Sequence, residues 1–210
     1  MKRNSSSKNK RPRVYAFIDA ENMRNAAEAY DYFDLDYEKM YFWLKKKRGV
    51  SKIFIYAAIE QGDVAKEQRY LKLNRPDCQV NLKTVVAYKQ PVWLLSTTCP
   101  HCKQQFIRKT YIKDKKKANC DAELTLDLVR LVYEKKYDKA IIFSGDGDFC
   151  KVYNFLVTEK HIKITVYSPI KKGIKITSTK VKEMASSGMI KLEDLGCILF
   201  NYGLKQIVVS

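Results

Sequence analysis

The sequence has no apolar run long enough to span a membrane. Residues 1–13 are polar and basic and lack the apolar segment of a secretory signal. No G-x-G-x-x-G or Walker A pattern follows the first apolar run, so the phosphate loop of a small-nucleotide enzyme is also missing. These absences argue against a membrane-spanning or secreted protein, and against a phosphohydrolase of small nucleotides on a Rossmann-like sheet.

Acidic residues are few compared with basic ones. The 210-residue chain has 23 Asp and Glu against 40 Lys and Arg, which gives a formal net charge of +17. Such an excess favours a polyanionic partner, chiefly nucleic acid. A membrane surface is the weaker alternative, because no basic amphipathic helix with a clean apolar face is found.

Disulfides are not needed, although six cysteines are present. A hydrophobic content of 46% and a length of 210 residues suit one α/β domain with a small insertion and an ample core. We therefore expect a reducing, cytoplasmic environment, with metal ligation open to some of the thiols.

Short apolar runs alternate with helical patterns along the chain. This alternation predicts a parallel sheet covered by helices on both faces. We expect a basic tail over 1–13, one domain over 14–192 with a hairpin-like insertion over 90–117, and a final segment over 193–210 that we do not assign. The predicted strands are 14–18, 53–59, 80–88, 139–143, 162–167 and 189–192, and the predicted helices are 22–30, 37–47, 63–73, 121–135, 149–160 and 177–186.

Acidic residues follow the ends of predicted strands or begin predicted helices. Asp19 follows the first strand, Asp121 begins the longest helix, and Asp146 and Asp148 follow the strand that ends at Phe143. Strand carboxyl ends and helix amino ends meet at one edge of a parallel sheet, so these acids can converge there. Carboxylates rarely cluster without a cation, and Mg²⁺ or Mn²⁺ is the expected one. Such an ion can activate water and neutralise charge on a phosphodiester.

Each acid also has a simpler interpretation. Asp121 can cap a helix, and Asp146 and Asp148 can form a turn beside two glycines. Asp127 lies six residues after Asp121, off its face of a regular helix, which argues against a shared ligand role. Taken together at strand and helix boundaries, the acids favour a functional site.

Three segments of the sequence resemble the motifs of a known family. They are Phe17 to Asn22 (FIDAEN), Asn119 to Asp127 (NCDAELTLD) and Phe143 to Phe149 (FSGDGDF). In order and spacing they are similar to the motifs of NYN domains, and closest to the LabA-like (DUF88) branch of the PIN-like nucleases, over about residues 13–187. The family often has Lys-Gly-Val before its second acid, where this chain has Ala118-Asn119-Cys120.

The resemblance implies a three-layer α/β/α PIN-like (Rossmann-like) sandwich with a mainly parallel central sheet, and metal-dependent ribonuclease activity. It implies a metal site formed by Asp19, Asp121, Asp146 and Asp148, with Asn22 as a further catalytic residue. The supporting residues that we expect from the acid cluster and the motifs are Ser144, Glu123 and Asp127.

The insertion contains a Cys-x-x-Cys pair, Cys99 and Cys102, with the spacing of a zinc knuckle. One knuckle supplies two ligands, and no second Cys-x-x-Cys is present. Cys120, Cys78, His101 or a second copy of the chain in a homodimer could supply the others. The alternative is a pair of free thiols or a reversible disulfide on a surface loop.

Basic and aromatic residues also alternate in the insertion. Cationic side chains hold phosphates and exposed aromatic rings, such as Phe106 and Tyr111, stack on unpaired bases, which predicts a surface that guides a nucleic-acid strand. The residues expected to contact nucleic acid are Lys103, Arg108, Lys109, Lys113, Lys115, Lys116 and Lys117.

The sequence therefore predicts an endoribonuclease dependent on Mg²⁺ or Mn²⁺ that acts on single-stranded or structured RNA. The alternative is a non-catalytic RNA-binding module with the same fold.

Overall fold

The computed structural model describes residues 11–30, 34–88, 93–110, 115–117, 120–170, 173, 175–202 and 205–206. Its centre is a sheet of seven strands in the order β10-β9-β8-β1-β3-β4-β7. The first six pair in parallel, and β7 pairs antiparallel with β4. The bounds are β1 (Val14–Asp19), β3 (Val50–Glu60), β4 (Cys78–Tyr88), β7 (Lys115–Lys117), β8 (Lys139–Phe143), β9 (Lys163–Ser168) and β10 (Lys191–Asp194).

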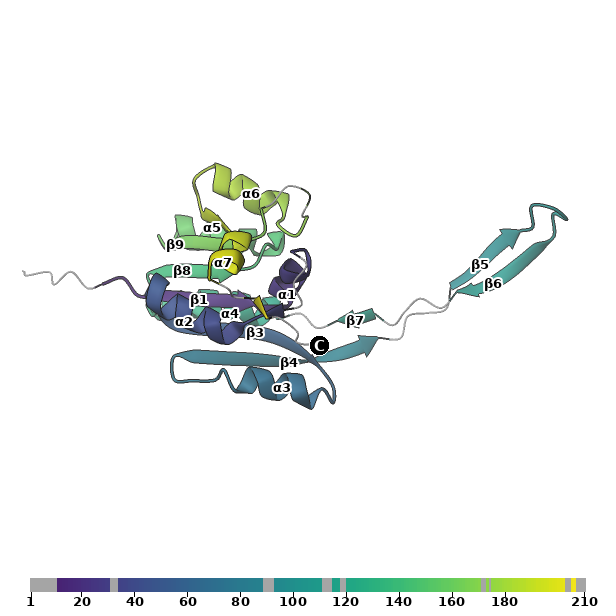
Figure 1. Ribbon diagram of the computed structural model, residues 1–210. Helices are drawn as coiled ribbons and strands as arrows, with labels where there is room; N and C mark the ends of the chain where they lie inside the picture. Colours follow the sequence, from purple (N-terminus) through teal and green to yellow (C-terminus); the bar gives the residue numbers. More distant parts are fainter. Residues whose placement is uncertain are drawn as a thin grey trace, which may run out of the picture.

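Helices cover both faces of this sheet, as Figure 1 shows. One core cluster packs α1, α2, α3 and α7 against the sheet, and the other packs α4, α5 and α6 against the opposite face. The central strands are apolar on both faces, as strands of a covered parallel sheet are. The predicted three-layer α/β/α architecture is therefore confirmed. The helices are α1 (Ala20–Glu28), α2 (Tyr37–Arg48), α3 (Val64–Leu71), α4 (Asp121–Tyr133), α5 (Cys150–Thr158), α6 (Thr179–Ser186) and α7 (Leu195–Tyr202).

Aspartates begin the three helices α1, α2 and α3. The carboxylates of Asp19, Asp36 and Asp63 each accept a hydrogen bond from a backbone N–H in the first helical turn, at 3.0 Å. Gly49 ends α2 in the left-handed conformation, with φ of 63°. Helix α2 covers the whole of the predicted helix 37–47. Helix α3 ends at Leu71, two residues before the end of the predicted helix 63–73.

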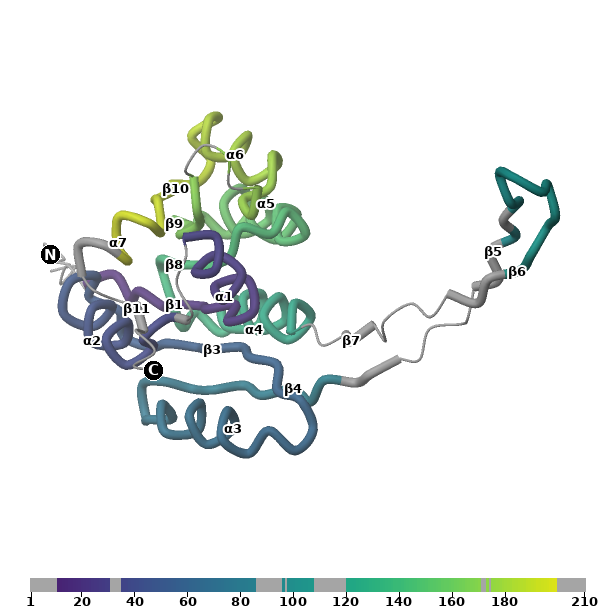
Figure 2. The backbone as a smooth tube through the Cα atoms, turned by 45° about the vertical axis from the view of Figure 1, so that its right-hand side comes forward, coloured from purple at the N-terminus to yellow at the C-terminus, as the bar shows by residue number. Residues whose placement is uncertain are grey.

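The insertion forms an antiparallel hairpin, as predicted. Its strands β5 (Trp93–Thr98) and β6 (Gln105–Thr110) pair with each other and not with the central sheet. In both views the hairpin projects away from the sheet, with its turn at the far end (Figures 1 and 2). The hairpin is therefore an arm on the domain and not part of its core.

The end of the chain supplies elements that the sequence did not predict. Helix α7 packs on the sheet through buried Leu195, Ile198 and Leu199. Near the end of the chain, β11 (Lys205–Gln206) pairs antiparallel with β2 (Asp34–Leu35), which lies between α1 and α2. No helix in the described part of the chain is long and apolar enough to cross a membrane.

Candidate active site

Asp19 lies where β1 ends and α1 begins. Its Oδ1 accepts the backbone N–H of Asn22 at 3.0 Å, and its Oδ2 accepts the hydroxyl of Ser144 at 3.1 Å. Ser144 follows β8, which is the parallel neighbour of β1 in the sheet. The two strand ends are thus connected directly at the carboxyl edge of the sheet.

Asn22 connects the same two segments a second time. Its Oδ1 accepts the backbone N–H of Gly145 at 2.9 Å. The loop after β8 is tightly enclosed there: a Cβ on Gly145 would lie 2.2 Å from the Ser168 hydroxyl oxygen and 3.0 Å from the Thr177 Cα. A glycine is therefore required at this close approach.

Asp146 follows that glycine and caps a short 3₁₀ turn, η1 (Gly147–Phe149). Its Oδ1 accepts the backbone N–H of Asp148 at 2.9 Å. Asp146 is half-buried, whereas Asp148 is exposed. The turn gives the two acids different environments although they are only two residues apart.

Asp121, at the start of α4, and Asp146, in the loop after β8, lie close enough to Asp19 for their charges to act on it. Burial is the largest influence on Asp19 and raises its pKa, which reaches about 6. The backbone N–H of Asn22 and the Ser144 hydroxyl oppose this shift, while the charges of Asp121 and Asp146 add to it. We call these three acids, with Asn22 and Ser144, the acidic notch.

Three other predicted residues lie in different settings. Glu123 forms an ion pair with Lys83 at 2.7 Å. Asp127 accepts the Tyr56 hydroxyl at 2.8 Å and the Arg130 guanidinium at 2.8 Å, so its carboxylate connects α4 to β3. Asp148 is exposed, and its contact with the site is the backbone N–H that it donates to Asp146. The acidic notch therefore contains five of the eight catalytic and supporting residues that the sequence predicted.

The donor set of the acidic notch suits a hard divalent cation. Among the described residues, no three His, Cys, Asp or Glu side chains stand together as a ready-made ligand group. Mg²⁺ does not require one, because it usually keeps several waters and binds through one or two carboxylates. Burial and the charges of two further acids disfavour the ionised form of Asp19. A bound cation would offset this cost.

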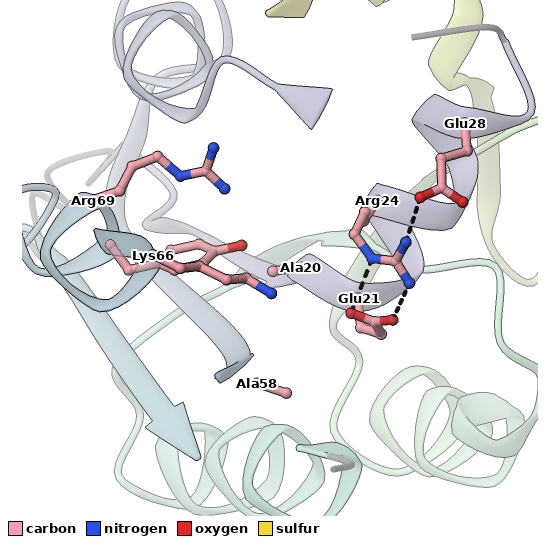
Figure 3. Close-up of a pocket in the computed structure, with 8 residues that line it drawn as sticks. Ala20, Glu21, Arg24, Glu28, Ala58, Lys66 and Arg69 are labelled. Carbon is pink, nitrogen blue, oxygen red and sulfur yellow. Dashed lines mark hydrogen bonds and ion pairs between the residues drawn. The ribbon is translucent and has the colours of Figure 1, made fainter. Parts of the chain in front are cut away.

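A pocket lined by three basic and two acidic side chains lies at the same edge of the sheet, beside the first residues of α1. It has a volume of about 260 Å³ and a floor of Ala20 and Ala58. Figure 3 shows Lys66 and Arg69 of α3 on one side of it and Arg24 on the other. Arg24 is paired with two glutamates of its own helix.

The sequence reasoning missed Lys66 and Arg69 as candidate binding residues. They are three residues apart in a helix that follows a predicted strand, so both project from one side of that helix at the carboxyl edge. This spacing could have identified Lys66 and Arg69 from the sequence, but the insertion has more lysines and was taken as the binding surface instead.

The hairpin turn holds the two cysteines of the predicted knuckle. Cys99 is half-buried and Cys102 is exposed, and both are free thiols. Backbone N–H groups of Cys102 and His101 hydrogen-bond to the Cys99 sulfur and lower the pKa of this thiol. Lys103 follows in a left-handed conformation, with φ of 60°. The turn thus favours a thiolate at Cys99, the form that binds metal.

The predicted nucleic-acid surface of the insertion is only partly within the described structure. Lys103 is exposed at the turn of the hairpin, which projects away from the central sheet in Figure 1, and Phe106 is 50% exposed. Arg108 and Lys109 lie in β6, and Lys115, Lys116 and Lys117 form β7. Lys113 and Tyr111 lie outside the described residues.

Comparison with solved structures finds a similar fold. The crystal structure of a protein of unknown function, VPA0982 from Vibrio parahaemolyticus RIMD 2210633, superimposes with a TM-score of 0.59 at 20% identity. The match covers 88% of this chain and 93% of the other. No curated protein matches the sequence. The family model of the NYN domain matches residues 13–193, which include all three motifs of the acidic notch, and the chain therefore belongs to the NYN domain family within the PIN-like nuclease superfamily.

Proposed function

We propose that this NYN domain is a metal-dependent endoribonuclease that hydrolyses RNA phosphodiester bonds at the acidic notch. The observation that carries the proposal is the direct connection of Asp19 and Asn22 to the loop of Asp146 through Ser144 and Gly145, with the charges of Asp121 and Asp146 acting on Asp19. Family membership supports it, because NYN domains are generally nucleases.

The chain's own residues would prepare the site. Asp19, Asp121 and Asp146, with Asp148 at its exposed rim, would hold Mg²⁺ or Mn²⁺, which supplies activation of water and charge neutralisation on the phosphodiester. Ser144 fixes one oxygen of Asp19. Asn22 fixes the loop after β8 through its Oδ1, and its amide N–H would orient a phosphate oxygen of the substrate.

Substrate binding would depend on positive charge. The +17 net charge would attract single-stranded or structured RNA over a distance. Lys66 and Arg69 lie at the edge of the sheet that carries the acids, so they are suited to hold a phosphate next to the cleaved one. Phosphate contacts of this kind position a strand without reading its sequence.

A cleavage assay on labelled RNA and DNA, with Mn²⁺ or with EDTA, tests this proposal. Asp146→Asn should abolish metal-dependent RNA cleavage and retain RNA binding. Asp36→Asn is the matched control: it makes the same chemical change at a helix cap of α2, where asparagine caps as well as aspartate, and should leave cleavage unchanged. Wild-type protein that binds a mixed RNA pool and leaves it uncut with Mn²⁺ would contradict the proposal.

The second candidate is a non-catalytic RNA-binding module with the same fold. It is favoured by the lack of a ready-made trio of metal ligands among the described residues. In that case Asp146→Asn would change no activity of the protein. The same assay separates the two functions.

The hairpin turn is proposed to hold a structural zinc ion. Cys99 and Cys102 would supply two thiolate ligands. Among the described residues no third His, Cys, Asp or Glu joins them, so a second copy of the chain would supply the rest in a homodimer. Metal analysis of wild-type protein and of a Cys99→Ser, Cys102→Ser double variant tests this, with zinc expected only in the former. All six cysteines are free thiols, which supports a reducing cytoplasm as the location that we propose.

A further inference from the structure

Tyr153 has a buried hydroxyl without a partner. This tyrosine lies in α5, and its side chain is fully buried. Its hydroxyl oxygen has no contact with solvent and no hydrogen-bond partner among the described residues. Two other buried tyrosines differ in this respect: Tyr56 donates to Asp127 at 2.8 Å, and Tyr137 donates to the carbonyl of Leu128 at 2.7 Å. Since buried polar groups are nearly always hydrogen-bonded, the hydroxyl of Tyr153 requires an explanation.

The hydroxyl lies beside the acidic notch. Tyr153 is near the start of α5, directly after the loop that carries Asp146, and its ring stacks on Phe149 with centroids 6.1 Å apart. Burial is the largest influence on Tyr153 and raises its pKa well above its usual value, and the nearby Cys150, Asp19, Asp146 and Asp121 add to this shift. The hydroxyl therefore keeps its proton and can act as a hydrogen-bond donor.

Packing alone does not account for this hydroxyl. A phenylalanine would fill the same space between the sheet and α5 without a desolvated polar atom, and it would be the more stable choice. A buried hydroxyl that lowers stability and lies near carboxylates is typical of a functional site, where the bound ligand supplies its hydrogen-bond acceptor.

We propose that Tyr153 is a positioning residue of the acidic notch, whose O–H donates to an oxygen ligand of the bound divalent cation and fixes that ligand's orientation. The inference rests on the proposed function, because it requires a cation between the acids. Outer hydrogen bonds of this kind orient metal ligands, and their loss commonly weakens metal binding 10- to 100-fold.

Two variants that remove one hydroxyl each provide the test. Tyr153→Phe removes the unpartnered hydroxyl. Tyr137→Phe removes a hydroxyl that donates to the backbone carbonyl of Leu128 in α4, and Tyr137 itself precedes β8, at the opposite edge of the sheet. Thermal unfolding in EDTA measures the cost to the fold. Titration with Mn²⁺ alone, followed by the loss of the free-ion electron paramagnetic resonance signal, measures binding, with Asp146→Asn as the background.

Tyr153→Phe is expected to unfold at the same temperature as wild type or higher, and to bind Mn²⁺ at least about 10-fold more weakly. Tyr137→Phe is expected to unfold at a lower temperature and to bind Mn²⁺ as wild type does. Equal Mn²⁺ affinity in wild type and Tyr153→Phe would overturn the inference and leave the proposed function intact. If wild type binds no more Mn²⁺ than Asp146→Asn, both fail together. If Tyr153→Phe is destabilised as much as Tyr137→Phe, the Tyr153 hydroxyl stabilises the fold, and this result would also overturn the inference.

Discussion

Replacing Asp19 by Asn should make the metal-free protein more stable while removing its activity. Burial and the two neighbouring acids raise the pKa of Asp19 from 3.8 to about 6. At pH 7.5 the folded protein must hold this carboxylate ionised, which costs about 3 kcal/mol at roughly 1.4 kcal/mol per pKa unit. Asparagine removes the charge and still caps α1, because Asn and Asp are comparable caps.

We expect a net gain of about 2 kcal/mol, since partial solvation of the notch reduces the full penalty. For a chain of this size that corresponds to a rise of about 4–8 °C in the melting temperature. Thermal unfolding in EDTA at pH 7.5 measures the gain. The control is Asp63→Asn, the same change at the exposed cap of α3, which should leave the melting temperature unchanged.

The pH dependence of the gain has a definite sign. Between about pH 4 and pH 6 the folded protein keeps a proton on Asp19 that the unfolded chain has already released. Wild-type stability therefore falls as the pH rises through this window, relative to Asp19→Asn. The difference between the two proteins should be absent below about pH 4 and complete above about pH 6.

Mn²⁺ should reverse the order of stability at pH 7.5. A cation that binds only the folded protein stabilises wild type in proportion to the logarithm of its concentration, and Asp19→Asn should lose most of this effect. An Asp19→Asn protein less stable than wild type in EDTA, or a gain that does not change with pH, would refute the electrostatic reasoning.

Three further substitutions test separate parts of the structure. Lys66→Ala should weaken RNA binding and lower the slope of log affinity against log salt concentration by about one. Lys163→Ala, at the opposite edge of the sheet, should weaken binding less. Binding assays at several salt concentrations measure both effects. Gly145→Ala should destabilise the fold by about 1–3 kcal/mol in urea unfolding, because its Cβ would collide with a serine hydroxyl at 2.2 Å. Asp127→Ala should lower the free energy of unfolding by about 1–3 kcal/mol, because it leaves the Tyr56 hydroxyl buried without its partner. The variant should retain RNA cleavage. Loss of cleavage in a folded variant would show that Asp127 is part of the active site.

Local patterns determined most of the fold. Apolar runs bounded by Asp19, Gly49 and Asp63 specify where strands end and helices begin, because caps and left-handed glycines act within a few residues. Once strands and helices alternate, the parallel sheet and its carboxyl edge follow from short, right-handed connections. Helix α7 escaped prediction because its 3.6-residue pattern is short and its apolar residues are explained only by the sheet that they cover.

The sequence by itself determined that Asp19, Asp121 and Asp146 belong to one edge, since strand ends and helix starts meet there. Helix spacing already argued against Asp127 as a shared ligand, but only the tertiary structure revealed the partners of Glu123 and Asp127. These partners, Lys83 and Tyr56, lie on other strands, 40 and 71 residues away in the chain. Only the tertiary structure, too, revealed Tyr153, which in the sequence is one more apolar-face tyrosine of a helix. A hydrogen bond, or the lack of one, depends on which distant residues the fold brings within about 3 Å, and no local pattern encodes that distance.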